Sequence, residues 1–340
     1  MHPRMFHRRF TALSTGFAAD ERFSRTLQIC DSAFPPRAVR GRCFRRAWRL
    51  RNVGADVLLY GAILSDNGQT SLRPASLWMP RLSANLSFLF NEAPFLERFG
   101  EAARAGFRAV EFAFAYDVPE HTIAARVEAH GLECVLINTP PGDYAAGERG
   151  IAALPGRENE FAAGFANALR YARALQCSRI HAMAGVLPRD ADADAHAHAR
   201  RTFIGNLRSA CAEAHRHGVT VLIEALNPRD VPGYLFSTQA AAHAIREEVG
   251  APNLKVQMDF YHAQVVEGDL AVKLERWLPH IGHIQIAGTP GRHEPDIGEI
   301  NYTWLLRRVD ELGYDGWVGC EYRPLRGTAE GLPWRNRLLV

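Results

Sequence analysis

The sequence predicts an α/β protein in which residues 79–340 form a (β/α)8 TIM barrel. Strand signals and helix signals alternate eight times after Met79. The strand runs are continuously apolar, as expected for parallel strands that helices cover on the outside. The 262 residues from Met79 to Val340 match the ~250 residues that are typical of such a barrel. No short sequence repeat explains the alternation better.

The eight predicted strands are short runs of apolar or β-branched residues, each bounded by turn or helix signals. They comprise residues 82–88, 109–114, 132–138, 179–185, 219–224, 254–259, 281–285 and 316–321. The last four read VTVLIE, LKVQMD, IGHIQ and GWVGCE. Between successive runs the chain is long enough for one helix, so each strand is predicted to be followed by a helix.

Proline in the first turn and glycine after the last turn mark the ends of several predicted helices. The first helix begins near Pro94 and ends at Gly106. The others are predicted at about 119–130, 157–175 and 193–217, from Ser237 or Thr238 to Val249, from Asp269 onward, and at 302–312. The chain after Arg326 is predicted to be a loop, with Trp334 available for packing.

Residues 1–78 differ from the rest of the chain in charge. They hold 13 arginines and 5 acidic residues, a net charge of +8, whereas the remainder holds 27 basic and 32 acidic residues, a net charge of −5. Three interpretations apply: an organellar transit peptide, a basic arm that touches nucleic acid, or an extension upstream of a true start at Met79. We favour the third, and we expect residues 1–78 to be poorly ordered and residues 79–340 to be the catalytic domain.

The composition, 47% hydrophobic and 23% charged, is typical of a soluble globular protein. No run approaches the ~18 apolar residues of a membrane helix, and no phosphate-binding glycine motif follows a strand. The six cysteines lack a C-x-x-C pair. Cys134, Cys177 and Cys320 lie in or beside apolar runs, which favours buried free thiols in a reducing compartment. We therefore expect a cytoplasmic protein that binds neither membranes nor nucleotides, with homo-oligomerisation left open.

Each of the last four strand runs ends on a residue able to bind a metal, namely Glu224, Asp259, Gln285 and Glu321. The carboxyl ends of barrel strands form the face on which α/β barrels place their chemistry. Three carboxylates that converge there without a cation would repel one another strongly. Strand ends often carry a single polar residue, but four oxygen-bearing side chains in consecutive units favour one bound divalent metal.

Other polar residues near the predicted barrel mouth are weaker candidates. Arg292 and Glu294 lie on the polar loop after the seventh strand. An arginine fork suits a substrate carboxylate, although a loop arginine is as often solvated. His181 on the fourth strand is a candidate to face the substrate, although a lone strand histidine more often belongs to the core. Asn85 and Asn138 lie at strand ends and are candidates to reach the substrate.

Eight segments of the predicted barrel carry a family resemblance. They read ANLSFLF, VEFAF, GERGIAALPGRE, RIHAMAG, VLIEALNPRDVPGYL, KVQMDFYHAQVVEGD, GHIQIAGTPGRHEPDIGEINY and YDGWVGCEYRP. As a set, these segments are specific, and the chain from Met79 to about Trp334 resembles the hydroxypyruvate isomerase family, within the superfamily of xylose-isomerase-like barrels. Relatives that are 2-oxo-tetronate isomerases look at least equally similar.

The resemblance implies that Glu224, Asp259, Gln285 and Glu321 bind one divalent cation, Mg²⁺ or Mn²⁺, which agrees with their hard oxygen ligands. It also implies that Glu224 and Glu321 are the acid–base pair that moves a proton between neighbouring carbons of a 2-oxo-3-hydroxy acid through an enediolate, with the metal as Lewis acid. In sugar epimerases of the superfamily a histidine three residues after the aspartate contacts the substrate, which implies that role for His262. Those enzymes often have histidine in place of Gln285, which weakens the case for a free-sugar substrate.

Three other functions compete with the isomerase. An apurinic-type endonuclease would need more histidine ligands and a positive face for DNA, whereas the predicted barrel has a net charge of −5. A non-catalytic sugar-acid binder would not need two opposed glutamates. A sugar or sugar-acid epimerase would use the same two glutamates, and only the resemblance favours the isomerase over it. The expected partner is therefore a small oxo-acid and not a nucleic acid.

Overall fold

The structure, a computed structural model, describes residues 60–64, 70–74 and 80–338. Two short strands come first in the chain, β1 (Tyr60–Leu64) and β2 (Thr70–Pro74), and they pair in a two-stranded sheet. Both lie in the segment for which we predicted poor order. The rest of that segment, including Met79, lies outside the described residues, so the predictions for residues 1–78 stay predictions.

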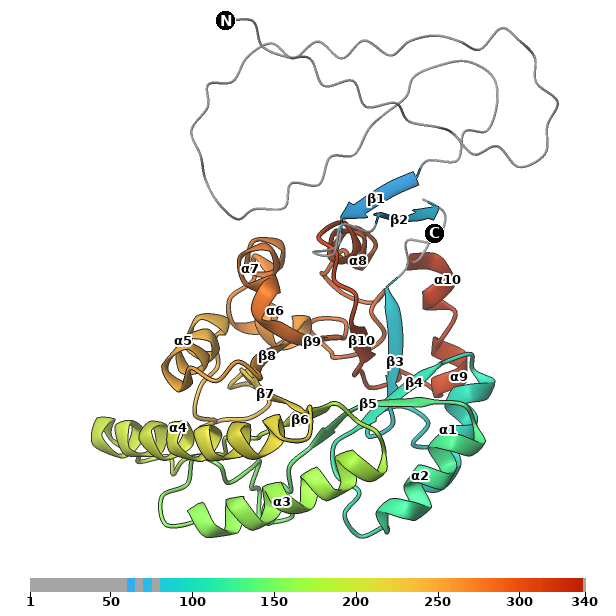
Figure 1. Ribbon diagram of the computed structural model, residues 1–340. Helices are drawn as coiled ribbons and strands as arrows, with labels where there is room; N and C mark the ends of the chain where they lie inside the picture. Colours follow the sequence, from blue (N-terminus) through green and yellow to red (C-terminus); the bar gives the residue numbers. More distant parts are fainter. Residues whose placement is uncertain (1–59, 65–69, 75–79, 339–340) are drawn as a thin grey trace, which may run out of the picture. The chain divides into compact units, whose positions relative to one another are not determined.

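Among residues 80–338, eight parallel strands close into a barrel (Figure 1), which confirms the predicted fold class. In chain order they are β3 (Arg81–Asn85), β4 (Ala109–Phe112), β5 (Glu133–Asn138), β6 (Arg179–His181), β7 (Thr220–Glu224), β8 (Leu254–Asp259), β9 (Ile281–Ile286) and β10 (Trp317–Cys320). Each strand pairs with the next one along the chain, and β10 pairs with β3 to close the barrel. The carboxyl ends of the strands therefore meet at one rim, which we call the mouth.

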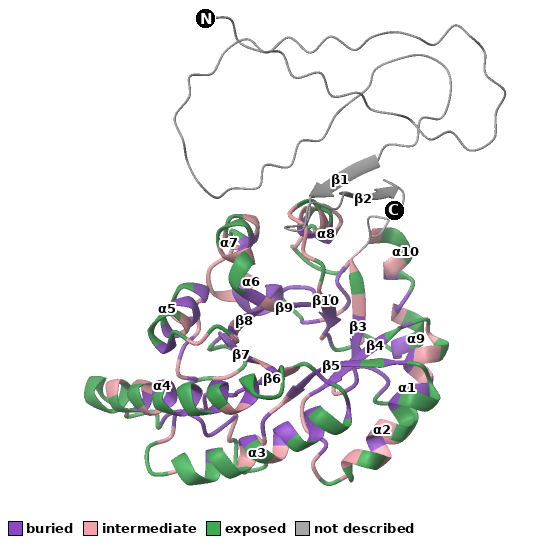
Figure 2. Ribbon diagram, viewed as in Figure 1, coloured by how far each residue is buried: buried purple, intermediate pink, exposed green. Residues whose placement is uncertain are grey.

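Helices cover the outside of the barrel, with their buried residues toward the strands (Figure 2). They are α1 (Phe95–Arg104), α2 (Glu120–Ala129), α3 (Glu158–Ala174), α4 (Ala193–His215), α5 (Gln239–Val249), α6 (Phe260–Val266), α7 (Leu270–Trp277), the 3-10 helix η2 (Leu278–His280), α8 (Tyr302–Glu311), α9 (Thr328–Gly331) and α10 (Trp334–Leu338). Thr238 caps α5, since its hydroxyl accepts a hydrogen bond from the Ala241 N–H at 3.1 Å. Gly250 then ends α5 in the left-handed conformation, with φ 73°.

Two strands end at least three residues earlier than the sequence predicts. β3 ends at Asn85 and β6 at His181, whereas the predicted runs continued to residues 88 and 185. At the first of these ends, the Asn85 side-chain oxygen accepts a hydrogen bond from the Ser87 N–H at 3.0 Å. Such a local turn draws the backbone away from the neighbouring strands. The apolar residues 86–88 therefore lie beyond the end of β3, at the mouth.

The tail after Arg326 is helical, and the prediction of a loop there was wrong. It contains α9 and α10, and Trp334 at the start of α10 is fully buried. The Trp334 Nε1 donates a hydrogen bond to the Tyr322 hydroxyl at 3.0 Å. Helices of four and five residues are too short to show a periodic pattern in the sequence. The tertiary packing of Trp334 holds α10 in place.

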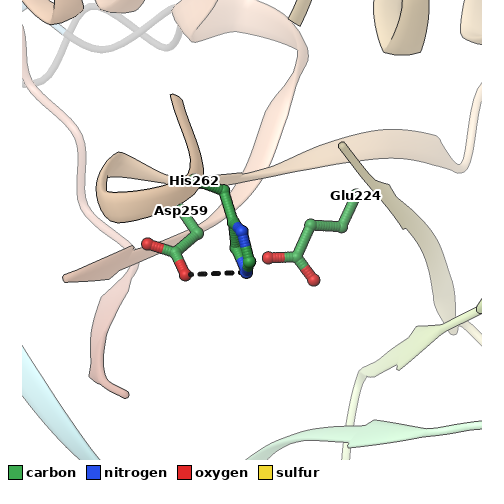
Figure 3. A group of neighbouring side chains, drawn as sticks. All are labelled: Glu224, Asp259 and His262. Atoms are coloured by element: carbon green, nitrogen blue, oxygen red, sulfur yellow. Dashed lines mark ion pairs between the residues drawn. The ribbon is translucent and has the colours of Figure 1, made fainter. Parts of the chain in front are cut away.

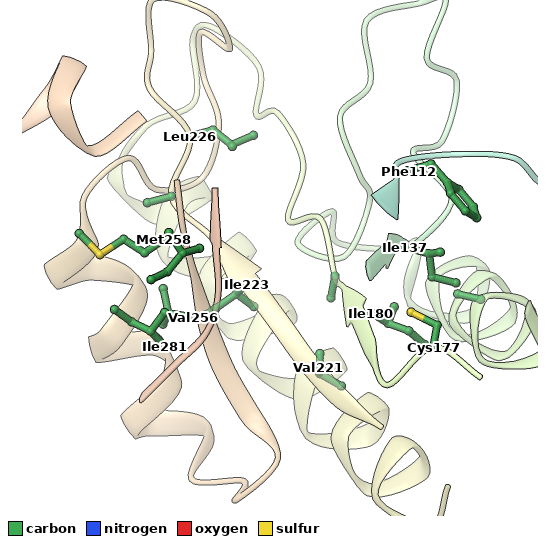
Figure 4. Close-up of a cluster of buried hydrophobic side chains, with 14 of the residues drawn as sticks. Phe112, Ile137, Cys177, Ile180, Val221, Ile223, Leu226, Val256, Met258 and Ile281 are labelled. Atoms are coloured by element: carbon green, nitrogen blue, oxygen red, sulfur yellow. The ribbon is translucent and has the colours of Figure 1, made fainter. Parts of the chain in front are cut away.

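Side chains alternate along the barrel strands between the inside and the outside. Apolar residues such as Val256, Met258 and Ile281 lie beside the flanking helices (Figure 4). The intervening positions include polar residues, and Glu111 on β4 contacts His283 on β9 at 2.9 Å. Because β4 and β9 are not neighbours, this contact crosses the inside of the barrel. The barrel interior below the mouth therefore contains charged and polar side chains.

Over the part of the chain that the structure describes, no helix is long and apolar enough to cross a membrane. Cys134, Cys177 and Cys320 are buried free thiols, as predicted, and so is Cys211. The other two cysteines precede the described residues.

Candidate active site

The four predicted metal ligands lie at the mouth, on four successive strands. Glu224 and Asp259 are the last residues of β7 and β8, Gln285 is the penultimate residue of β9, and Glu321 directly follows β10. The strand register sets Asp259 beside Gln285. The first three are buried, and the Glu321 side chain is 15% exposed. The mouth therefore holds three acidic side chains in a largely buried space.

Glu224, Asp259 and His262 form a compact group (Figure 3). Each offers one potential ligand atom within 4.8 Å of the other two. The Glu224 Oε1 atom is buried and has no hydrogen-bond partner among the described residues. A buried carboxylate oxygen without a donor is unfavourable unless a cation or another partner satisfies it. The two carboxylates of this group therefore fit a metal site.

Gln285 contacts Glu321 and two residues that the sequence analysis did not identify. Its Nε2 donates hydrogen bonds to Glu321 Oε2 at 2.5 Å and to Glu111 Oε1 at 2.7 Å. Its Oε1 accepts a hydrogen bond from Gln257 Nε2 at 2.7 Å. The structure thus places Gln285 at the predicted position with its amide nitrogen toward Glu321. A half-turn of the amide would present the oxygen instead, as metal ligation requires.

Arg292 supplies a positive charge to the acidic side chains. Its Nη2 donates to Glu321 Oε1 at 2.6 Å and to Asp259 Oδ2 at 3.3 Å. Its guanidinium carbon lies 4.8 Å from the ring centre of Phe88 and 4.9 Å from that of Tyr261. Arg292 is 6% exposed, so it is not the solvated loop arginine that the sequence left as an alternative. Its side chain is held by stacking and by charge together.

Burial and like charges raise the pKa values of the three acidic side chains. Burial is the largest cause in each case, and it raises the pKa of Glu224 well above its usual range, raises that of Asp259, and raises that of Glu321 to about 8. Repulsion from its two acidic neighbours adds to the effect at Glu224, whereas Arg292 opposes it at all three. Added positive charge stabilises groups whose charged forms are disfavoured in this way. The electrostatics therefore also fit a divalent cation.

His262 and His181 lie beside different acidic residues. The His262 Nε2 is 3.7 Å from Asp259 Oδ2, and the His181 Nδ1 is 3.6 Å from Glu224 Oε2. Burial lowers the pKa of His262 well below its usual range and that of His181 to about 3. Both imidazole rings are therefore neutral near pH 7.

The hydrogen bonds of His262 determine which ring nitrogen carries the proton. Its Nδ1 accepts a hydrogen bond from the Asn227 N–H at 3.1 Å and lies 2.7 Å from Asn227 Nδ2. A neutral ring whose Nδ1 is an acceptor carries its hydrogen on Nε2. The Nε2 atom is the one that faces Asp259, and a protonated nitrogen donates to an oxygen instead of binding a metal. The geometry thus favours a substrate contact over metal ligation for His262.

Glu294 is placed away from this group. Both of its carboxylate oxygens accept the Leu325 N–H at 3.2 Å. Within the described ranges, no hydrogen bond or ion pair joins Glu294 to the acidic side chains at the mouth. Its carboxylate supports the segment that follows Glu321, and the geometry gives no support to the predicted substrate contact.

Sequence reasoning missed a lower level of residues beneath the predicted ligands. Side chains two residues apart share a strand face, so the residues two positions before the ligands also face the interior. They are Leu222 on β7, Gln257 on β8, His283 on β9 and Gly319 on β10, of which Gln257 and His283 are polar. Glu111 on β4 reaches the same level. The signal was present as polar residues at period two in QMD and HIQ, and as the single acidic residue within the apolar run VEF.

Comparison with known proteins gives consistent matches over the barrel. Residues 99–338 match the family model of the xylose isomerase-like TIM barrel. A 2-oxo-tetronate isomerase of Cupriavidus necator is 56% identical over 256 residues, which cover 75% of this chain and 97% of that protein. The hydroxypyruvate isomerase of Escherichia coli is 45% identical over 258 residues, 76% of this chain and 99% of that protein. A crystal structure from Brucella melitensis, described as an AP endonuclease of family 2, is 49% identical with a TM-score of 0.74, over 76% of this chain and 99% of that chain.

Proposed function

This chain belongs to the hydroxypyruvate isomerase family of xylose isomerase-like TIM barrels, and from that membership we propose that it is a metal-assisted isomerase of 2-oxo-3-hydroxy acids. The reaction would convert hydroxypyruvate to tartronate semialdehyde, or a 2-oxo-tetronate to the 3-oxo-tetronate. The observation that carries the proposal is the set of three acidic side chains at the mouth, with raised pKa values and with Arg292 between two of them.

The proposed metal is Mg²⁺ or Mn²⁺, held by Glu224, Asp259 and Glu321, with Gln285 as a fourth ligand after its amide turns. Oxygen donors of this kind suit hard divalent cations. The unpartnered Glu224 Oε1 supports the choice of site. When bound, the cation would act as a Lewis acid toward the substrate carbonyl and the adjacent hydroxyl.

Glu224 and Glu321 are the proposed acid–base pair, and their hydrogen bonds differ. Glu321 accepts from Arg292 at Oε1 and from Gln285 and Asn85 at Oε2. Glu224 Oε1 has no hydrogen-bond partner in the described part of the chain. Glu224 is therefore the less constrained of the two carboxylates and is proposed to take a proton from a substrate carbon, while Glu321 is held in one orientation to exchange a proton at the neighbouring carbon. The raised pKa of Glu321, about 8, lies near neutral pH, where proton exchange is efficient.

Arg292 and His262 are the proposed substrate contacts. The Arg292 Nε is buried and has no hydrogen-bond partner among the described residues, so it remains available to a substrate carboxylate. The hydrogen on His262 Nε2 is available to a substrate oxygen, as argued above. His181 stands beside Glu224 and is a further proposed contact. The cationic contact from Arg292 suits an anionic oxo-acid better than a neutral sugar.

We also propose a cytoplasmic location and a small oxo-acid partner, without nucleic acid or membrane. The four buried free thiols among the described residues support a reducing compartment. Self-association stays a proposal that size measurement in solution can test.

A second candidate, cleavage of DNA at apurinic sites, is favoured by the description of the Brucella melitensis structure. Against it, DNA binding needs a positive surface, whereas residues 79–340 have a net charge of −5. His262, which lies beside Asp259, also presents a protonated nitrogen. A sugar epimerase would use the same two glutamates, so only substrate preference separates it from the isomerase.

A substrate panel with and without a chelator tests these alternatives together. Hydroxypyruvate, 2-oxo-tetronates, ketoses and DNA with an apurinic site would each be incubated with the protein in Mg²⁺, in Mn²⁺ and in EDTA. We expect carbonyl-shifted products from the oxo-acids, loss of activity in EDTA, and recovery when metal is added back. Turnover of a ketose or of DNA in preference to every oxo-acid would refute the proposal.

A further inference from the structure

A cavity with a volume of about 760 Å³ lies at the mouth, beside the acidic side chains. Its walls are formed by loop residues that follow β3, β4, β5 and β10, whereas the proposed metal ligands belong to the ends of β7–β10. None of the proposed ligands or catalytic residues lines it. The cavity therefore occupies the half of the mouth that the proposed metal site leaves open. The lining residues that matter below are Phe88, Asn91, Ala113, Phe114, Tyr144 and Arg323.

The cavity adjoins the acidic side chains through Phe88 and Arg323. Phe88 lines the cavity, and its ring centre lies 4.8 Å from the guanidinium carbon of Arg292. Arg292 in turn donates to Glu321 at 2.6 Å. Arg323 lies two residues after Glu321, and its N–H donates to the Arg292 carbonyl at 2.7 Å. A substrate whose carboxylate contacts Arg292 can therefore extend its far end into the cavity.

The cavity walls combine aromatic rings with polar groups that are free to bind. The ring centres of Phe114 and Tyr144 are 5.5 Å apart, and Tyr144 is 52% exposed. Asn91 Nδ2 donates to the Phe88 carbonyl at 2.9 Å, whereas Asn91 Oδ1 accepts no hydrogen bond from the described residues. The Arg323 guanidinium makes neither a hydrogen bond nor an ion pair within the same ranges. Such a mixture of rings and a few polar groups is typical of sites that bind small molecules.

The volume of the cavity determines how long a substrate it can hold. Hydroxypyruvate and a 2-oxo-tetronate differ by one CHOH unit, which is about as large as one or two water molecules, each of ~30 Å³ in the liquid. A cavity of about 760 Å³ has room for several such units, and it lies within the ~300–1,000 Å³ range of small-molecule sites. A four-carbon acid therefore fills only part of it.

We propose that this cavity is the subsite for the substrate chain beyond C3, and that it admits five-carbon 2-oxo-pentonates besides the three- and four-carbon acids. The inference rests on the proposed function. A longer chain leaves the reaction unchanged: carbon C3 loses a proton, carbon C2 gains one, and a hydroxyl proton passes from the C3 oxygen to the C2 oxygen, which gives the 3-oxo-pentonate. The hydroxyl groups of the chain donate to Asn91 Oδ1 and accept from Arg323, while its carbons pack on the rings of Phe114 and Tyr144.

Rates on acids of three, four and five carbons test the proposal. We expect the wild type to convert a 2-oxo-pentonate with a kcat/KM at least equal to its value for hydroxypyruvate. Ala113→Leu fills part of the cavity and removes no hydrogen-bonding side chain. One carbon unit in a pocket changes kcat/KM by ~10–200-fold, so the ratio of kcat/KM for the pentonate to that for hydroxypyruvate should fall by at least ~10-fold. A wild type that converts hydroxypyruvate but no 2-oxo-pentonate would overturn the proposal, and so would a folded Ala113→Leu with an unchanged ratio.

Arg323→Gln is a second variant, which loses a guanidinium that pairs with no described residue. It should lower the same ratio by at least ~3-fold, because one hydrogen bond to the chain is lost. If Ala113→Leu does not fold, Arg323→Gln decides, and an unchanged ratio overturns the proposal. Ala240→Leu and Arg201→Gln are the matched controls, since both residues are exposed on helices and neither lines the cavity. Both controls should keep the wild-type ratio.

Binding of unreactive acids separates this inference from the proposed function. A five-carbon aldonate has the carboxylate and the hydroxyl-bearing chain without the 2-oxo group, and glycerate is its three-carbon counterpart. In titration calorimetry the aldonate should bind the wild type at least ~10-fold more tightly than glycerate does, and Ala113→Leu should abolish this difference. Equal dissociation constants in the wild type would overturn the inference. A wild type inactive on every oxo-acid would instead overturn the proposed function, and the two dissociation constants would still decide the role of the cavity.

Discussion

Glu321 should make the stability of the metal-free protein depend on pH. Burial raises its pKa from 4.5 to about 8, so the folded protein keeps this proton over a range in which the unfolded chain has lost it. The stability contributed by this group is therefore fully present below pH 4.5 and is lost as the pH rises through about 8. A difference of about 3.5 pKa units corresponds to about 5 kcal/mol over the whole range, or about 1.4 kcal/mol for each pH unit within it.

Glu321→Gln removes this titration and is the matched comparison. His181 and His262, whose pKa values burial lowers, change stability in the opposite direction, but both proteins contain them. The charge of Glu321 is one cause of the raised pKa of Glu224, so its removal also lowers that pKa and adds to the difference between the two proteins in the same direction. Urea unfolding in EDTA should show the stability of the wild type relative to the variant falling by about 3 kcal/mol between about pH 5.5 and about pH 7.5. Mn²⁺ should increase the free energy of unfolding of the wild type more at the higher pH, because metal binding requires ionised carboxylates. A difference between the two proteins that is flat with pH would refute the reasoning.

Three further substitutions have clear expected outcomes. Glu224→Gln should lower kcat by at least ~10²-fold with an unchanged circular dichroism spectrum, and near-full activity would contradict its role as a base. Arg292→Lys keeps the charge but loses the planar fork, so KM for an oxo-acid should rise by ~10-fold or more in steady-state assays; an unchanged KM would exclude the carboxylate contact. Trp334→Ala should lower the free energy of unfolding by ~3–5 kcal/mol in urea titrations, and a loss below ~1 kcal/mol would mean that the tail contributes little packing.

The barrel was predictable because its signals are local. Apolar runs, first-turn prolines and terminal glycines each depend on neighbours in the chain. The errors fall where local signals are weak or absent. α6 follows β8 directly, with the Asp259 carboxylate accepting the Tyr261 N–H at 2.8 Å, and α10 is held by the burial of Trp334. Neither arrangement can be recognised before the packing partners are known.

The candidate site was predictable in its positions but not in its contacts. Strand ends placed Glu224, Asp259 and Glu321 together, because parallel strands end at one rim. The burial of Arg292 against two aromatic rings depends on Phe88, which follows β3, and on Tyr261 in α6, which follows β8. The direction of the Glu294 side chain, toward Leu325 and away from the mouth, also depends on the fold around it. The sequence predicts where a residue lies on a strand, whereas the residues that a long polar side chain contacts depend on the folded barrel.

The alternation of side chains along β8 bears on how such a barrel changes during evolution. Val256 and Met258 pack against helices, whereas the alternate residues Gln257 and Asp259 face the interior. An exchange at an inward position alters hydrogen bonds and charge without opening a cavity in the apolar packing outside. Mutations that retune chemistry can therefore accumulate one at a time in a chain that stays folded. Descendants of one ancestral barrel can diverge in substrate while they keep the same packing between strands and helices.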